Sequence, residues 1–174
     1  MKQLSKSAIK YPYTAIGQVI SKVGTSYGYG TGFMIGPNHV LTSANNVYDY
    51  STGAVAKKVQ FTPGLTKGFN PHGTFDVKVI LLQQTQVMNK GKGELAILVL
   101  GQSVGYATGW LGLCASKEKE ITALPAHITG YPSFSHDKMA TIMLSNPHMV
   151  NIKPSMINTS APADPGLNGA PCWV

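Results

Sequence analysis

Short apolar segments separated by turn residues recur along the whole chain, and this pattern restricts it to a β fold. In the first hundred residues the segments are 14–22, 30–35, 39–44, 59–62, 75–82 and 94–100. Gly, Pro or Asn flanks each of them, and none carries a helical stripe longer than a turn or two. Runs of this length with breakers between them predict β-strands. Six such strands are enough for one small barrel that ends near residue 100.

A second set of apolar segments follows the first and divides the chain into two halves. These segments are 109–113, 121–130, 138–145 and 149–158, and no internal repeat relates them to the first set. We therefore expect an all-β chain, with a first half over residues 1–104 and a second half over residues 105–174. The length of 174 residues and the 19 Gly and 11 Pro agree with a turn-rich β protein of ordinary domain size.

Basic residues are numerous, yet their chemistry argues against specific nucleic-acid recognition. The formal net charge is +7, and all 14 cationic side chains are Lys because the chain contains no Arg. Lysine carries a single point charge, whereas the guanidinium of arginine makes two parallel hydrogen bonds to a phosphate or a guanine. We expect a solvated basic surface and no specific nucleic-acid partner. No transmembrane segment is expected either, because the apolar runs are far shorter than the roughly 20 residues that span a bilayer.

The two cysteines, Cys114 and Cys172, do not form a metal-binding pattern. They lack the CxxC spacing and the nearby His residues of a zinc site. The sequence leaves open whether they pair with each other. We expect no metal and no cofactor.

Three segments, in this order along the chain, resemble one protein family. Residues 30–44, GTGFMIGPNHVLTSA, are similar to the strand pair that leads into the catalytic histidine of trypsin-like (chymotrypsin-fold) serine proteases, particularly their glutamyl-endopeptidase-like branch. Residues 94–100, ELAILVL, resemble the strand that opens with the catalytic aspartate, and residues 166–171, GLNGAP, resemble the Gly-x-Ser-Gly-x-Pro loop of the nucleophile. The resemblance implies two six-stranded-type antiparallel β-barrels. Only three residues, 172–174, follow the loop, so we expect the second barrel to be incomplete at the C-terminus.

The catalytic triad of this family maps onto positions where the chain carries other residues. By this resemblance Asn45 stands at the position of the base, Glu94 at that of the aspartate and Asn168 at that of the nucleophilic serine. An amide has no basic lone pair at neutral pH and no hydroxyl, so it replaces neither imidazole nor serine. No other His or Ser stands in the family's sequence context. The resemblance leaves the backbone amides of Gly166 and Asn168 as an oxyanion-hole-like pair.

These substitutions lead us to expect that the chain is not an enzyme. The expectation is a catalytically inactive serine-protease homologue, a pseudoenzyme that serves as a structural or accessory subunit of a larger assembly. Its partners would be other protein subunits at the open edge of the second barrel, where unpaired strands invite pairing. The alternative is a divergent or deliberately inactivated trypsin-like serine endopeptidase, which is a hydrolase. A peptide-hydrolysis assay separates the two.

Overall fold

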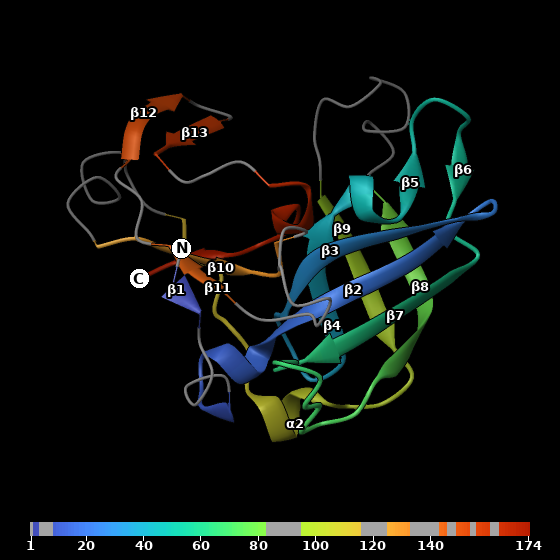
Figure 1. Ribbon diagram of the computed structural model, residues 1–174, viewed down its shortest axis with the longest axis horizontal. Helices are drawn as coiled ribbons and strands as arrows, with labels where there is room; N and C mark the ends of the chain where they lie inside the picture. Colours follow the sequence, from blue (N-terminus) through green and yellow to red (C-terminus); the bar gives the residue numbers. More distant parts are fainter. Residues whose placement is uncertain are drawn as a thin grey trace.

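The computed structural model describes residues 2–3, 9–82, 95–115, 125–132, 143–145, 149–153, 156–160 and 164–174. Strands dominate these residues, and the helical segments among them are single turns (Figure 1). The helical turns are η2 (Tyr13–Ala15), η3 (Ala44–Asn46), α2 (Gly105–Thr108) and η4 (Pro165–Leu167). The expected all-β class is therefore confirmed.

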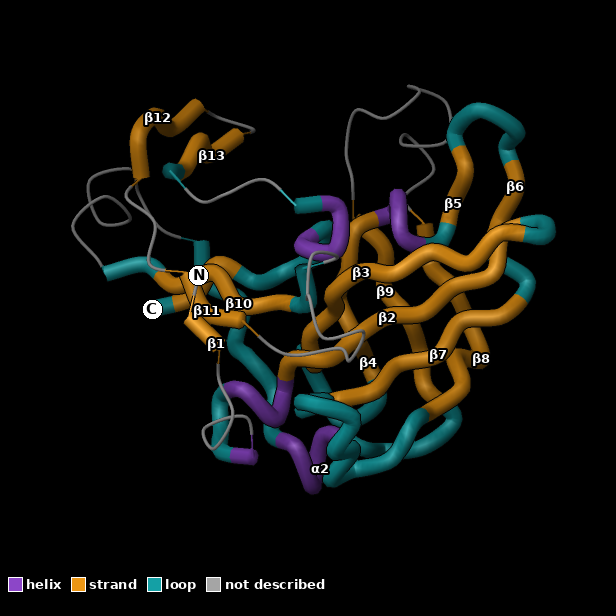
Figure 2. The backbone as a smooth tube through the Cα atoms, in the orientation of Figure 1, coloured by secondary structure: helices purple, strands orange, loops and turns teal. Residues whose placement is uncertain are grey.

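Six antiparallel strands of the first half close into a barrel in the order β2-β3-β4-β9-β8-β7 (Figure 2). They are β2 (Ile16–Val23), β3 (Ser26–Met34), β4 (His39–Ser43), β7 (Lys58–Pro63), β8 (Phe75–Leu82) and β9 (Leu95–Leu100). Each predicted segment of the first half corresponds to one of these strands. A small hairpin, β5 (Tyr48–Asp49) with β6 (Ala54–Val55), stands beside the barrel.

Along several strands, buried side chains alternate with less buried ones, and the buried side chains fill the barrel. The largest fully buried side chains include Phe61, Ile16, Met34 and Leu98, which come from four different strands. Gly17, on β2, makes room for the Phe61 ring, because a Cβ at this position would overlap the ring carbons. Burying such side chains stabilises the fold by about 1.5–3 kcal/mol each, so the barrel is the stable unit on which the site is built.

The second half places shorter strands beside the barrel. A four-stranded sheet has the order β1-β11-β10-β14, and β12 pairs with β13 as a separate hairpin. The second half contributes β10 (His127–Gly130), β11 (Met143–Ser145), β12 (Met149–Lys153), β13 (Met156–Thr159) and β14 (Cys172–Trp173). The edge strand β1 (Lys2–Gln3) comes from the N-terminal end of the chain and pairs with β11. The described strands of this half form an open sheet rather than a closed barrel. The boundary between residues 104 and 105 stays a prediction.

Two segments predicted as strands have a different structure. Residues 109–113 form no strand. Gly109, which follows the end of α2, has a φ of +73°, and Leu111 donates one backbone hydrogen bond to Met34 O (2.9 Å). Residues 149–158 are not one strand but the hairpin of β12 and β13. Pro154 interrupts this segment in the sequence, and a proline is a turn signal that the apolar pattern alone overlooks.

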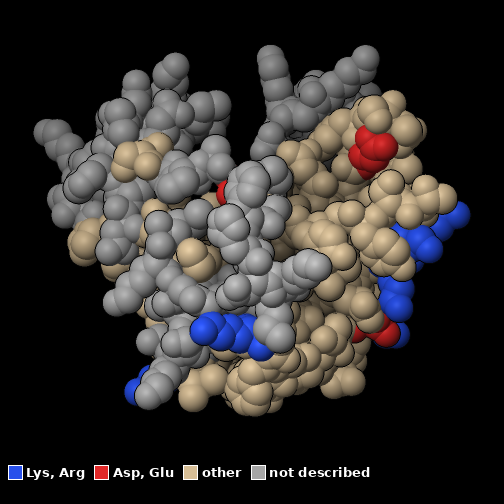
Figure 3. Space-filling view, in the orientation of Figure 1, with Lys and Arg blue, Asp and Glu red and all other residues tan. Residues whose placement is uncertain are grey.

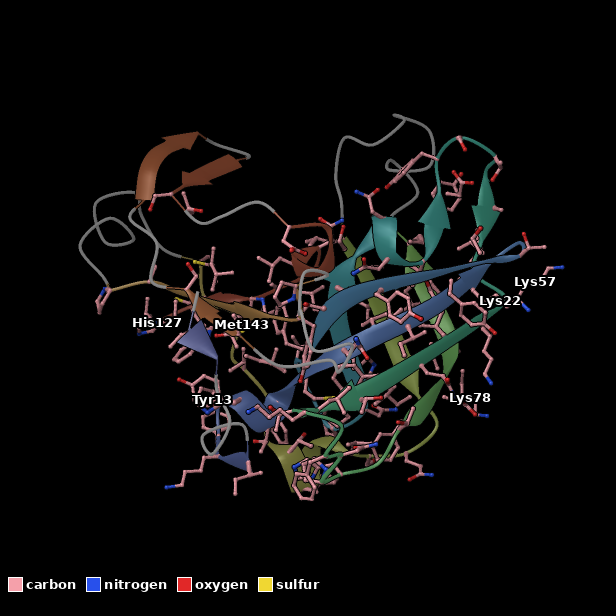
Figure 4. All side chains as sticks on the ribbon, viewed as in Figure 1. Tyr13, Lys22, Lys57, Lys78, His127 and Met143 are labelled. Carbon is pink, nitrogen blue, oxygen red and sulfur yellow. The ribbon has the colours of Figure 1, made fainter. Side chains whose placement is uncertain are left out.

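An aromatic cluster connects the second sheet to η2. The Trp173 ring meets the Tyr13 ring edge-on at 5.9 Å and the His127 ring at 4.7 Å, measured between centroids; Figure 4 labels Tyr13 and His127. Trp173 Nε1 also donates to Thr129 Oγ1 (3.0 Å). Cys114 and Cys172 are both exposed, and no disulfide joins them. Within the described residues, no helix has the length and apolar character needed to cross a membrane.

Candidate active site

Two of the three predicted triad positions, Asn45 and Asn168, fall on segments that the fold brings together. Asn45 lies in η3, directly after β4, and Asn168 lies in the turn after η4; both residues are exposed. Glu94 lies outside the described residues. The local sequence explains both turns. Val47 N–H donates to Ala44 O (3.0 Å) to close η3, and Pro165 occupies the first position of η4, where its fixed φ fits a helical turn.

Thr31, at the centre of β3, is the residue on which the loop 166–171 rests. Its N–H donates to Asn168 O (2.9 Å), and its Oγ1 donates to Gly166 O (2.8 Å). The same Oγ1 accepts a hydrogen bond from Tyr131 N–H (2.9 Å) in the second half. Thr31 is completely buried, so these bonds are shielded from water. One side chain of the barrel thus joins the loop and the second sheet.

Asn46 is a site residue that the sequence analysis missed. It is buried, and its Nδ2 donates to Asn168 O (2.7 Å), to Thr42 Oγ1 (2.8 Å) and, at a longer distance, to Thr31 O (3.3 Å). Gly30 makes room for this side chain, because a Cβ there would overlap the Asn46 amide. The only signal in the sequence is a second Asn next to the predicted base position. Asn46 therefore ties β3, β4 and the loop together.

Gly169 is required by the close approach of the loop to the barrel. Its φ is +84°, in the left-handed region that favours glycine. A Cβ at this position would overlap Thr31 O and Thr42 Oγ1 and would lie 2.7 Å from Ser43 N. The side-chain hydroxyl of Ser43 is also buried and has no hydrogen-bond partner among the described residues. The glycine of the family loop pattern is thus needed here for space as well as for conformation.

The two backbone amides predicted as an oxyanion-hole-like pair lie in different surroundings. Gly166 is buried, and its N–H donates to Asp164 Oδ1 (2.8 Å), so this amide already has an acceptor within the loop. Asp164 was not singled out by the sequence. Asn168 is exposed and is held by its carbonyl oxygen rather than by its side chain. The oxyanion role of Gly166 and Asn168 stays a prediction.

Tyr131, which follows β10, is fully enclosed between the two halves. Its Oη donates to Ile16 O (3.4 Å), and burial raises the pKa of the phenol far above its ordinary value. The phenol is therefore neutral at every physiological pH. It acts as a structural hydrogen-bond donor beside the site and is not a proton carrier.

No family model matches the chain, but individual proteins do. This chain is 29% identical over 129 residues to the extracellular metalloprotease of Bacillus subtilis (strain 168). The aligned residues cover 72% of this chain and 41% of that protein. It is 26% identical over 122 residues to the glutamyl endopeptidase of Bacillus licheniformis, covering 70% of this chain and 37% of that protein. The chain thus spans about two fifths of the length of these curated relatives.

Solved structures show the same relationship at the level of the fold. A structure of Glu endopeptidase in complex with MPD superposes with a TM-score of 0.77 at 16% identity, over 98% of this chain and 78% of that one. The chymotrypsin fold is therefore confirmed. The resemblance to the glutamyl-endopeptidase-like branch of the trypsin-like serine proteases is confirmed as well.

These comparisons correct one of our expectations. We expected that the chain is not an enzyme, and this is wrong, because the relatives and the structural neighbour are named as peptidases. They support the hydrolase alternative instead of an inactive structural subunit. The partner expected at the open edge of the second half stays a prediction.

One relative is named a metalloprotease, and the described residues do not fit a metal. They contain no group of three or more His, Cys, Asp or Glu side chains that could hold an ion. The residues that meet at the loop offer mainly amides, hydroxyls and backbone groups, which do not form a zinc ligand set. No metal-dependent step is therefore assigned to them.

Proposed function

We propose that this chain is a divergent trypsin-like serine endopeptidase, a hydrolase of peptide bonds that works between η3 and the loop 166–171. The hydrogen bond from Asn46 Nδ2 to Asn168 O (2.7 Å) carries this proposal. It joins the residue next to Asn45 to the backbone of Asn168. This contact supports the proposal because it brings the segment that contains Asn45 next to the segment that contains Asn168.

The proposed substrates are peptides with an acidic residue before the cleaved bond. The Bacillus licheniformis relative is named a glutamyl endopeptidase. The net charge of +7 supports the same choice, because a positive protein attracts acidic peptides at long range. Hydrolysis should therefore favour a glutamyl over a lysyl peptide, and the preference should weaken as salt screens the charges.

In this sequence the side chains at positions 45 and 168 limit the rate. Asn45 and Asn168 can hydrogen-bond to a substrate, but an amide neither accepts a proton at neutral pH nor attacks a carbonyl. Substrate binding and an oxyanion hole by themselves give roughly 10³ to 10⁴-fold acceleration over water in serine proteases. Here the Gly166 N–H already donates to Asp164 Oδ1, so we expect an acceleration no larger than this. The proposed activity is therefore slow, with water as the nucleophile. Its rate should rise when an imidazole and a hydroxyl are placed on the same backbone.

A peptide-hydrolysis assay with two variants tests the proposal. The purified chain, the double variant Asn45→His with Asn168→Ser, and the matched control Asn45→Ala with Asn168→Ala are incubated with fluorogenic glutamyl and lysyl peptides. We expect slow glutamyl cleavage by the chain and an increase of at least about 100-fold in kcat/KM for the His and Ser variant. The Ala variant should show no such increase.

The outcome that contradicts the proposal is equally specific. If neither the chain nor the His and Ser variant cleaves any peptide while both unfold cooperatively, the loop and η3 do not form a hydrolytic site. Labelling with a serine-directed phosphonate gives an independent check. The His and Ser variant should be labelled at position 168, and the Ala variant should not be.

A further inference from the structure

Aromatic and basic side chains collect on the outer face of the barrel, at the end where β2 turns into β3. We call Lys22, Tyr27, Tyr29, Lys57 and Lys58 the Tyr-Lys patch. Lys22 pairs with Tyr27 on one side and with Lys58 on the other, so one row of side chains crosses β3, β2 and β7. Directly paired residues share a face of the sheet, as do residues two apart, which adds Tyr29 to the same face.

The side chains of this patch are unusually open to solvent. Tyr27 is 60% exposed and Tyr29 is 56% exposed, so more than half of each side chain is open to a partner. Lys22 Nζ lies 5.5 Å from the centre of the Tyr27 ring, within the range of a cation–π contact. Lys57 and Lys58 are exposed beside them. Lys22 and Lys57 project at the tip of the hairpin in Figure 4.

Positive charge dominates this end of the barrel. Blue atoms follow the right-hand edge of the molecule in Figure 3, with red atoms at either end of this row. Two described acidic residues lie near the patch. Asp76 on β8 accepts a hydrogen bond at Oδ1 from Gln60 Nε2 (3.0 Å). Asp49 on β5 pairs with Ala54, three residues before Lys57. Gln60 lies two residues beyond Lys58 on β7, so Asp76 marks the boundary of the patch and does not neutralise its centre.

The shape of the patch selects among anionic partners. It lies beside the β2–β3 turn at Gly24, where a Cβ would meet no atom within 4 Å. A projecting hairpin fits a flat or concave partner, whereas single-stranded nucleic acids bind in grooves that follow their backbone. The patch contains lysine but no arginine. It is therefore better suited to a surface of diffuse negative charge than to the bidentate recognition of single phosphates. Tyrosine places its ring and hydroxyl at the headgroup level of a bilayer.

We propose that the Tyr-Lys patch docks the protein on an anionic lipid surface. The three lysines are attracted by the surface potential, each strengthening binding by about fivefold. The two tyrosine rings contact the headgroup region and add a contribution that salt does not screen. This role is independent of peptide hydrolysis and goes beyond the proposed function.

Flotation of the full chain with lipid vesicles tests the proposal. We expect binding to vesicles of phosphatidylcholine with phosphatidylserine, weaker binding at high salt, and little binding to phosphatidylcholine alone. The variant Lys57→Gln with Lys58→Gln should lose at least about tenfold in affinity. The matched control is Lys10→Gln with Lys67→Gln, which lowers the net charge equally at two exposed positions.

The control residues lie at the other end of the same strands. Lys10 precedes β2 and Lys67 follows β7, and these ends of the two strands meet at the pair Gly17 and Pro63. The control should change affinity by less than about threefold. Equal losses in the two double variants would mean that net charge alone attracts the vesicles, and the patch proposal would be overturned.

Two further measurements separate the lipid surface from other partners. The double variant Tyr27→Ser with Tyr29→Ser should weaken vesicle binding at high salt. Unchanged binding would show that the tyrosine rings do not contact the lipid. A single-stranded DNA oligonucleotide is tested by fluorescence anisotropy. DNA binding as tight as vesicle binding, with the same dependence on Lys57 and Lys58, would overturn the lipid assignment in favour of an anionic polymer. Circular dichroism of each variant establishes that the barrel is folded.

Discussion

The barrel of the first half and the loop that rests on it are stabilised in different ways. The barrel is closed by six paired strands and filled with apolar side chains such as Phe61 and Leu98. The loop 166–171 is held by a few hydrogen bonds to Thr31 and Asn46 and by the close approach of Gly169. Apolar burial is non-directional, whereas hydrogen bonds fix atoms in place. The barrel therefore supplies stability, and the loop contacts supply the geometry of the site.

We expect the largest effect on the free energy of unfolding from removing a large side chain from the barrel, compared with removing one from the second sheet. Phe61→Ala should lower the free energy of unfolding by about 4 kcal/mol, because it leaves a cavity in a closed barrel. Trp173→Ala should cost about 2 kcal/mol, because the half-buried indole of the open sheet loses ring contacts and one hydrogen bond. Urea unfolding followed by circular dichroism measures both. A Trp173→Ala loss as large as that of Phe61→Ala would show that the second sheet contributes to stability as much as the barrel does.

The next effect tests whether the close approach of the loop depends on glycine. Gly169→Ala should destabilise the docked loop by about 3 kcal/mol through backbone strain plus overlap with β3 and β4. The matched control, Gly24→Ala, has a similar φ of +58° but open space around it, and should cost only about 1 kcal/mol.

Hydrogen exchange at the Thr31 amide measures loop docking directly, because this N–H donates to Asn168 O. Gly169→Ala should speed its exchange by about 100-fold. Gly24→Ala should leave it nearly unchanged. Unaltered Thr31 exchange in Gly169→Ala would mean that the loop is not held against β3 as described.

The smallest effect separates two neighbouring asparagines. Asn46→Ala removes the donor shared by Asn168 O and Thr42 Oγ1 and should cost about 2 kcal/mol. Asn45→Ala removes an exposed side chain and should stay within about 0.5 kcal/mol. Thermal unfolding of the two variants, with the Thr31 exchange rate, gives the comparison. Equal effects at positions 45 and 46 would remove Asn46 from the role assigned to it.

Much of the barrel could be predicted from the sequence because strand signals are local. Alternating apolar residues between Gly, Pro and Asn turns report which residues face a core, and all six predicted segments of the first half are strands of the barrel. The same reasoning failed for residues 109–113 and for residues 149–158. In the first case a helical turn precedes a glycine of positive φ, and in the second the chain reverses within one apolar segment.

The site was predictable only as far as the resemblance reached. Its order of segments predicted Asn45, Gly166 and Asn168, and the carbonyl groups of Gly166 and Asn168 both bond to Thr31. The roles of these residues stay predictions. The function was predicted less well than the fold. Reading the substituted positions residue by residue led to an expectation of no enzyme, which the comparison with named peptidases corrected.

What the sequence by itself determined was the set of strands in the barrel, because each short apolar segment and the turn residues that bound it are local signals. What only the tertiary structure decided was the set of contacts that hold the site. Asn46 and Asn168 are 122 residues apart, Thr31 and Gly166 are 135 apart, and Thr31 and Tyr131 are 100 apart. The sequence around a polar residue does not show which distant residue it will bond to, because the hydrogen bond forms only after the two halves have packed together.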